Sequence, residues 1–203
     1  MDVYFSPLAC SLASRITLYE SGQEAQFQRV DTKAGKTASG EDYRKINPKG
    51  LVPALRTDDG AVLTENAAIL QYLADQRPES KLAPTGFARY QLQQWLSFIG
   101  SELHKTVFTP LLSPTWPAEG KAKAKEQAAE RLAYLNAHLT GRDWLLDDFS
   151  VADAYLAAVL NWNQAVKLDF SIYPAIQAYQ ARLMTRPAVQ KAAAEEFALF
   201  QPA

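Results

Sequence analysis

Three side chains in this sequence could carry chemistry: the single cysteine Cys10, the acid Glu65 and the imidazole His104. Cys10 stands between a proline-containing turn and a predicted helix start. At such a position the helix dipole and unpaired backbone N–H groups favour the thiolate, the nucleophilic form of cysteine. The alternative is a small buried hydrophobic residue. Ala13 occupies the place where a C-x-x-C pair would have its second cysteine, so any disulfide chemistry needs a thiol from outside.

Two further places could bind a small ligand. Pro53 opens a predicted hairpin strand, either as an edge-strand proline, with a cis bond as one option, or as an ordinary strand-opening proline. The edge-strand interpretation leaves the main chain of Val52 able to pair with an extended ligand. At Glu65 and Asn66 a predicted strand meets a helix, where N–H groups can bind a carboxylate and Glu65 can hold an amine. An acid placed only for the helix dipole is the alternative. Together these sites suggest a cleft for a peptide-like ligand with its thiol near Cys10.

His104 lies at the end of a stripe of small and polar residues on a predicted helix. Such a stripe is typical of one wall of a cleft, whereas a lone surface histidine with ordinary hydrogen bonds is the alternative. The stripe comprises Gln93, Ser97, Gly100, Ser101 and His104. The apolar face beside it comprises Leu92, Trp95, Leu96, Ile99 and Leu103, which recur at helical spacing.

The elements that must position these residues fall into two predicted domains. Residues 1–80 read β-α-β, then a short helix, then a β-hairpin turning at Asp59-Gly60 and a helix. The first two strands are expected to be parallel and the hairpin antiparallel. Residues 86–203 carry only helical patterns, including a capping box at Ser150–Asp153 and a helical pair flanking Arg186-Pro187. The predicted fold class is therefore α/β followed by an all-α bundle.

Composition excludes several function classes. The net charge is -1, which gives no reason to expect nucleic acid or an anionic membrane as a partner. No apolar run approaches the ~20 residues of a membrane span, and no secretory signal is visible. A single cysteine cannot form an internal disulfide or a cysteine-rich zinc site, so no metal is expected. These features favour a soluble, cytoplasmic protein.

Several motifs, at matching spacing over the whole chain, resemble the glutathione transferases, and most of all their bacterial beta class. The motif ACSLAS resembles the class cysteine segment, NPKG with VPAL the cis-proline strand, and LTE-x-x-AI-QYLAD the γ-glutamyl site. ELHK and FSVADAYL resemble two motifs of the helical domain. The resemblance implies a thioredoxin-like first domain, glutathione as co-substrate and a homodimer.

The resemblance also implies roles for individual residues. Cys10 and His104 would be catalytic. The residues implied to bind glutathione are Cys10, Lys33, Val52, Pro53, Glu65, Asn66, Ser97, His104 and Lys105. Those implied to form the wall of an electrophile site are Phe108, Leu111, Leu112 and Trp116. Two positions depart from the family: Asn66 is often serine, and Ser97 stands where an asparagine is usual. For the glycine end of glutathione, Lys33 is preferred over Lys36.

The function implied is conjugation of glutathione to small apolar electrophiles, with thiol–disulfide exchange through a mixed disulfide at Cys10 as a second chemistry. A thiol is a weaker hydrogen-bond donor than the tyrosine or serine hydroxyl that other transferases direct at the glutathione sulfur. The alternative is a non-catalytic module of the same fold that binds apolar ligands or a protein. A specialised reductive dehalogenase or ether-cleaving relative is a third hypothesis. Sequence does not identify the electrophile.

Overall fold

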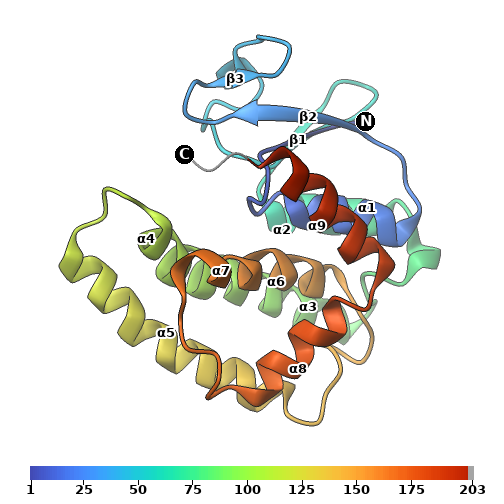
Figure 1. Cartoon of the computed structure of the whole chain (residues 1–203). Coiled ribbons are helices and arrows are strands. Elements are labelled where there is room, and N and C mark those ends of the chain that lie inside the picture. Colours follow the sequence, from blue (N-terminus) through green and yellow to red (C-terminus); the bar gives the residue numbers. More distant parts are fainter. Residues whose placement is uncertain (201–203) are drawn as a thin grey trace. The chain divides into compact units, whose positions relative to one another are not determined.

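The computed structural model describes residues 1–200, and its contacts divide the chain into two compact units (Figure 1). Unit 1 contains residues 1–83 together with the segment from Pro187 onward. Unit 2 contains residues 84–186. A mixed sheet with helices in unit 1 and a purely helical unit 2 confirm the predicted fold class.

The last helix departs from the predicted domain division of 1–80 and 86–203. This helix, α9 (Pro187–Leu199), belongs to unit 1 because its side chains are bonded to the first helix of that unit. A helical period cannot reveal which unit a helix packs against. Residues 201–203 of the predicted second domain lie outside the described residues.

Unit 1 is built on a five-stranded sheet with the order β3-β2-β1-β4-β5. The strands are β1 (Asp2–Phe5), β2 (Gln26–Asp31), β3 (Lys36–Thr37), β4 (Ala54–Arg56) and β5 (Val62–Thr64). The β1–β2 pair is parallel and the β4–β5 hairpin is antiparallel, as predicted. The two-residue strand β3 has no counterpart among the predicted elements. It is too short to show a strand period in the sequence.

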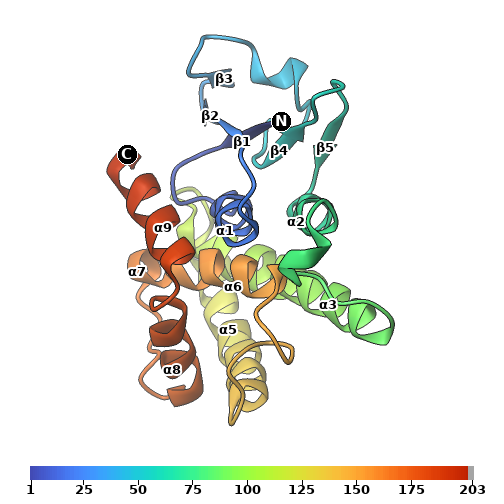
Figure 2. The ribbon, with the colours of Figure 1, turned by 90° about the vertical axis from the view of Figure 1, so that its right-hand side faces the viewer.

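Helices α1 (Leu12–Ser21) and α2 (Asn66–Asp75) lie under one face of this sheet (Figure 2). Gly22 ends α1 as its C-cap, in the left-handed conformation that glycine readily adopts. Short 3-10 turns cover Tyr43–Lys45 and Pro78–Ser80.

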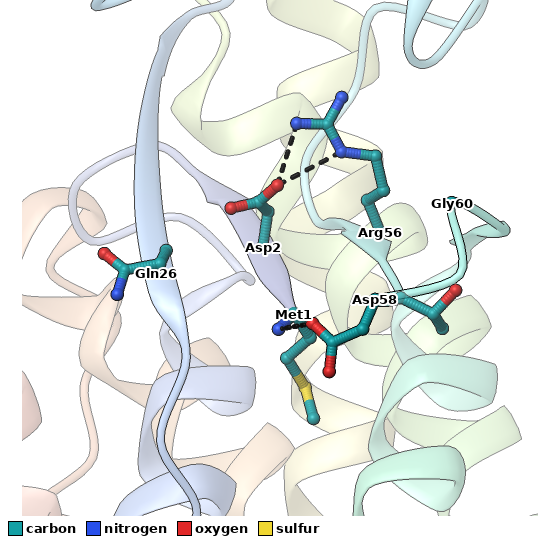
Figure 3. Close-up of a pocket in the computed structure, with 7 residues that line it drawn as sticks. Met1, Asp2, Gln26, Arg56, Asp58 and Gly60 are labelled. Carbon is teal, nitrogen blue, oxygen red and sulfur yellow. Dashed lines mark hydrogen bonds and ion pairs between the residues drawn. The ribbon is translucent and has the colours of Figure 1, made fainter.

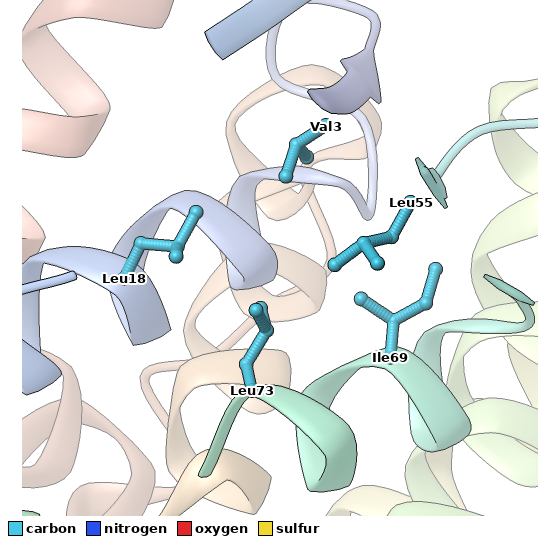
Figure 4. Close-up of a cluster of buried hydrophobic side chains, with 5 residues drawn as sticks. All are labelled: Val3, Leu18, Leu55, Ile69 and Leu73. Atoms are coloured by element: carbon cyan, nitrogen blue, oxygen red, sulfur yellow. The ribbon is translucent and has the colours of Figure 1, made fainter. Parts of the chain in front are cut away.

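The core of unit 1 lies between α1, α2 and the sheet. It is a cluster of five buried aliphatic side chains, Val3, Leu18, Leu55, Ile69 and Leu73 (Figure 4). Because successive strand residues point to opposite faces, Tyr4 follows Val3 onto the other face and packs with Val30, Tyr43 and Ala54. The sheet is therefore packed on both faces, which fixes the strand ends that carry the candidate site.

Unit 2 contains the remaining helices. They are α3 (Phe87–Phe98), a wider π-helical segment (Ile99–Phe108), α4 (Thr109–Leu112), α5 (Ala118–Leu139), α6 (Val151–Asn161), α7 (Asn163–Val166) and α8 (Pro174–Leu183). All five residues of the predicted apolar face, Leu92, Trp95, Leu96, Ile99 and Leu103, are buried. No helix within residues 1–200 is both long and apolar enough to cross a membrane.

The predicted capping box begins α6. Ser150 accepts from the backbone N–H of Ala152, and Asp153 accepts from the Ser150 N–H at 2.9 Å. Buried Asp153 also accepts from the Leu145 N–H at 3.0 Å and the Tyr179 hydroxyl at 2.8 Å. The carboxylate thus ties together the start of α6, the loop before it and α8.

Candidate active site

Cys10 lies in the turn that leads from β1 into α1. Its side chain is 8% exposed, and Sγ donates to the carbonyl oxygen of Val52 at 3.3 Å. The expectation of open N–H groups at the helix start is wrong for three of them. The N–H groups of Leu12, Ala13 and Ser14 donate to the carbonyls three residues earlier, which tightens the first turn. The thiol is therefore held by the segment that precedes β4.

Val52 and Pro53 stand just before β4, joined by a cis peptide bond. β4 is not an edge strand, because it lies between β1 and β5, but Val52 and Pro53 precede the paired residues Ala54–Arg56, and the cis option for Pro53 is confirmed. Pro53 is tolerated because it precedes the first ladder residue. The carbonyl of Leu51, the residue before Val52, accepts from the Tyr43 hydroxyl at 2.8 Å. Burial raises the pKa of Tyr43 to about 12, so this hydroxyl stays a donor.

Asn66 connects the start of α2 to the cysteine. Its Nδ2 donates to the Cys10 carbonyl at 3.1 Å, and the side chain is buried. Its Oδ1 is also buried and has no hydrogen-bond partner among residues 1–200. A buried acceptor without a partner is costly, so this oxygen is an unusual feature of the start of α2. The structure therefore brings together three predicted residues, Cys10, Val52 and Asn66.

Glu65 precedes Asn66 in an unusual backbone conformation, with φ at +71°. Its side chain is 72% exposed and forms an ion pair with Lys49 Nζ. Lys49 Nζ also donates to the Thr64 hydroxyl at 2.9 Å. Sequence reasoning missed Lys49, although its place in the turn before Pro53 is a usable signal. An accessible carboxylate that already holds an ammonium group can hold the amine of a ligand.

The two candidate lysines for the far end of the ligand lie at the β2–β3 turn. Lys33 is exposed, and its backbone N–H donates to Asp31 Oδ1 at 2.9 Å. Lys36 is the first residue of β3 and is also exposed. Their positions give no preference for Lys33 over Lys36.

His104 lies in the π-helical segment of unit 2. Nδ1 is 2.8 Å from the Tyr155 hydroxyl, and the ring packs edge-to-face on Trp162 at a centroid distance of 4.8 Å. Burial, helped by the nearby Lys105 charge, lowers the pKa of His104 to about 4. The imidazole is therefore neutral at pH 7. Ser97 and Lys105 are exposed in the same unit, and the Ser97 carbonyl accepts from the Ser101 hydroxyl.

The four predicted wall residues differ in accessibility. Phe108 is fully buried against Trp162, so its side chain packs inside unit 2 and is not exposed to a ligand. Leu111 is half-buried, whereas Leu112 and Trp116 are 41% and 44% exposed. Trp116 packs on Gly120, where a Cβ atom would lie 2.5 Å from the indole Nε1. Gly120 was not predicted, because a glycine in a polar helix start carries no sign of what packs on it.

A separate pocket of about 330 Å³ lies at the other end of β1 (Figure 3). It is lined by Met1, Asp2, Gln26, Arg56, Thr57, Asp58 and Gly60. Its charged groups are already paired, Asp2 with Arg56 and the Met1 ammonium with Asp58. Among the described residues no group of three histidine, cysteine or acidic side chains could hold a metal ion.

Comparison with known proteins identifies the class that this fold and site define. The profile "Glutathione S-transferase, N-terminal domain" matches residues 9–76, and "Glutathione S-transferase, C-terminal domain" matches 101–187. Glutathione S-transferase GstA of Escherichia coli O157:H7 is 45% identical over 199 residues, covering 97% of this chain and 98% of that protein. The chain therefore belongs to the glutathione S-transferase family.

Within that family, bacterial members are similar over nearly the whole chain. A sphingomonad glutathione S-transferase, solved in complex with glutathione, has a TM-score of 0.92 and 47% identity over 97% of this chain and 98% of its own. A bacterial beta class glutathione S-transferase of Sphingomonas chungbukensis has a TM-score of 0.93 and 42% identity over 97% and 98%. These comparisons confirm the predicted thioredoxin-like first domain and resemblance to the beta class. They also favour a transferase over a non-catalytic module.

Proposed function

We propose that this transferase binds glutathione along unit 1, with the ligand sulfur beside Cys10, and conjugates it to small apolar electrophiles. One observation carries the proposal: hydrogen bonds join the thiol turn, the segment at Val52 and the start of α2 at one place in unit 1. The solved sphingomonad relative, which carries glutathione, supports the choice of ligand. Val52 would pair with the peptide backbone of glutathione, and Asn66 would bind the ligand at the start of α2.

Glu65 holds the amine of the γ-glutamyl group in this proposal. The ligand ammonium replaces Lys49 at the Glu65 carboxylate, so binding exchanges one exposed ion pair for another. We expect Glu65→Gln to raise the Kd for glutathione about tenfold, as for a lost charged hydrogen bond. The measurement is isothermal titration calorimetry. Glu79→Gln, which breaks the exposed ion pair with Arg77, is the matched control and should bind as the parent does. Equal affinity of Glu65→Gln and the control would contradict the role of Glu65.

Cys10 adds a second reaction, thiol–disulfide exchange. Its thiolate attacks one sulfur of oxidised glutathione, the S–S bond breaks, and one glutathione leaves as a thiolate. A second external thiol then releases the protein thiolate and forms a new disulfide. A neutral imidazole such as that of His104 can take up or release a proton, but it carries no charge with which to pair a thiolate.

The exchange reaction is tested by mass spectrometry after incubation with oxidised glutathione. We expect one glutathione adduct, located at Cys10, and none in Cys10→Ala. The same variant should keep most of its glutathione affinity, because Val52, Glu65 and Asn66 remain. An unmodified parent thiol would remove the exchange reaction, and an equal loss of affinity would make Cys10 a binding element.

We further propose a homodimeric, cytoplasmic enzyme that acts in detoxification, with Leu111, Leu112 and Trp116 meeting the electrophile. The exposed apolar surface of Leu112 and Trp116 supports this choice. A panel of apolar electrophiles assayed with and without glutathione tests it. Sedimentation analysis tests the dimer.

A further inference from the structure

A buried ion pair that the proposed function does not use joins α1 to α9 within unit 1. Glu196 of α9 is 0% exposed and Arg15 of α1 is 5% exposed. Arg15 Nε donates to Glu196 Oε1 at 3.0 Å. The guanidinium also stacks on Phe5 and Phe27, with its carbon 4.6 Å and 3.6 Å from the two ring centroids. A charge buried this deeply is retained only with good partners, so the second carboxylate oxygen needs an explanation.

That second oxygen holds the turn leading to the cysteine. Glu196 Oε2 accepts the backbone N–H of Leu8 at 2.8 Å. Leu8 has a φ of +58°, a left-handed conformation that a leucine side chain disfavours. The turn around it is closed by the Ala9 N–H donating to the Ser6 carbonyl at 3.1 Å. A bond from outside the turn therefore helps to hold its disfavoured residue two positions before Cys10.

We propose that Glu196 is a positioning residue for Cys10: by accepting the Leu8 N–H from α9, its carboxylate fixes the turn that presents the thiol. The placement of Sγ at 3.3 Å from the Val52 carbonyl, with 8% exposure, depends on this turn. The consequence for catalysis rests on the proposed function of Cys10. Glu196 itself touches neither reacting atoms nor ligand in this proposal.

The neighbouring acid on α9 provides a matched control. Glu195 binds the same cation, with Oε2 at 3.1 Å from Arg15 Nη1, and accepts from the Tyr19 hydroxyl. Lys191 completes the charged groups here, 3.6 Å from Glu195 Oε1 and 3.7 Å from the Tyr19 ring centre. These bonds run from α9 to side chains of α1. Glu195→Gln therefore removes a carboxylate from the same network without removing the acceptor for Leu8.

The test separates positioning from simple stabilisation with a double variant, Arg15→Met with Glu196→Leu. An apolar replacement of a buried ion pair often preserves stability, but it offers no acceptor to Leu8. Two quantities are measured without glutathione: amide hydrogen exchange at Leu8 and the rate of Cys10 alkylation by iodoacetamide. In the double variant we expect Leu8 exchange to accelerate about tenfold or more, as for a lost hydrogen bond to a charge, and alkylation to become faster. Glu196→Gln keeps one oxygen acceptor and should fall between the double variant and the parent.

Parent-like Leu8 exchange and alkylation in a folded double variant would overturn the proposal. So would a Glu195→Gln variant whose two rates change as much as those of Glu196→Gln. Should the double variant not fold, Glu196→Gln decides, and an unchanged Leu8 exchange rate in it overturns the proposal. Neither Leu8 exchange nor Cys10 alkylation is measured with glutathione. A parent that fails to bind glutathione would therefore contradict the proposed function without affecting the test of Glu196.

Discussion

The His104 imidazole is uncharged at neutral pH, since burial lowers its pKa to about 4. A neutral ring can donate or accept one proton but cannot supply positive charge to a thiolate. This protonation state therefore favours proton transfer over charge stabilisation as the role of His104. The 2.8 Å contact with Tyr155 fixes the ring orientation in which a proton would move.

We expect the ring resonances of His104 to titrate with a midpoint near pH 4 in nuclear magnetic resonance spectra. The physical reason is that charging the ring would leave a cation buried beside Lys105. His104→Gln assigns the signal, because His138 is the only other histidine. The same variant should lower the conjugation rate without moving any inflection between pH 5.5 and 8. A midpoint of pH 6 to 7 would instead mean that the ring is partly charged near neutral pH and could stabilise a thiolate.

Sequence identified the residues of unit 1 whose chemistry is unusual in itself, such as the lone thiol of Cys10. It could not reveal Lys49 or Glu196, because their importance comes from what they touch. A lysine or glutamate in an ordinary loop or helix looks like a solvated charge. Glu196 in particular meets Leu8 across 188 positions of sequence, a separation that no local pattern spans.

At the scale of elements, the short joint between α4 and α5 sets the position of Trp116. The indole packs where Gly120 has no side chain, and an added Cβ would meet Nε1 at 2.5 Å. At that distance the indole would have to move. The exposed end of the predicted electrophile wall therefore depends on one hydrogen atom at position 120.

We expect Gly120→Ala to displace the indole of Trp116 and to change KM for apolar electrophiles while KM for glutathione stays constant. The helix itself should gain up to about 1 kcal/mol, because alanine favours helix over glycine. The measurements are the chemical shift of the Trp116 indole N–H and the two KM values. Lys121→Ala, which changes the next residue of the same helix, is the control. An unmoved indole signal would contradict the packing argument, and unchanged KM values with a moved indole would remove Trp116 from the site.

The elements that sequence missed share a physical cause. The strand β3 has only two residues, Lys36 and Thr37, so it shows no alternation. The π-helical segment was expected to continue the α-helix, because Ile99 and Leu103 stay buried in either winding. By contrast α1, α2 and α6 were predicted well, since each begins or ends at a residue with a specific backbone role, such as Gly22 or Ser150.

At the scale of the whole molecule, two buried groups make unfolding depend on pH with opposite signs. The pKa of Glu196 is raised to about 7 by burial, although the Leu8 and Arg15 bonds oppose this. Between about pH 4.5 and 7 the folded chain holds a proton that the unfolded chain has released. The contribution of Glu196 to stability is therefore complete below pH 4.5 and is lost as pH rises through 7. For His104 the unfolded chain holds the extra proton, so its contribution is complete above pH 6.5 and is lost as pH falls toward 4.

We expect these signs to appear as differences from the parent in the free energy of unfolding. The value for Glu196→Gln, relative to the parent, should rise with pH between 4.5 and 7 by up to about 3 kcal/mol. The value for His104→Gln, relative to the parent, should fall between pH 4 and 6.5 by up to a similar amount. Urea unfolding followed by two spectroscopic probes provides both curves and checks two-state behaviour. Differences of the same sign in the two variants would contradict the assignment.

The position of α9 in unit 1 has a consequence for biosynthesis. The sheet and its first two helices leave the ribosome long before α9, because all of unit 2 is translated in between. Until α9 arrives, Arg15 has no Glu196 to face and the Leu8 N–H lacks that acceptor. A nascent chain halted after unit 2 should therefore carry an assembled sheet in which the turn before Cys10 is not yet fixed. The Cys10 end of the protein is thus made first but reaches its final conformation last.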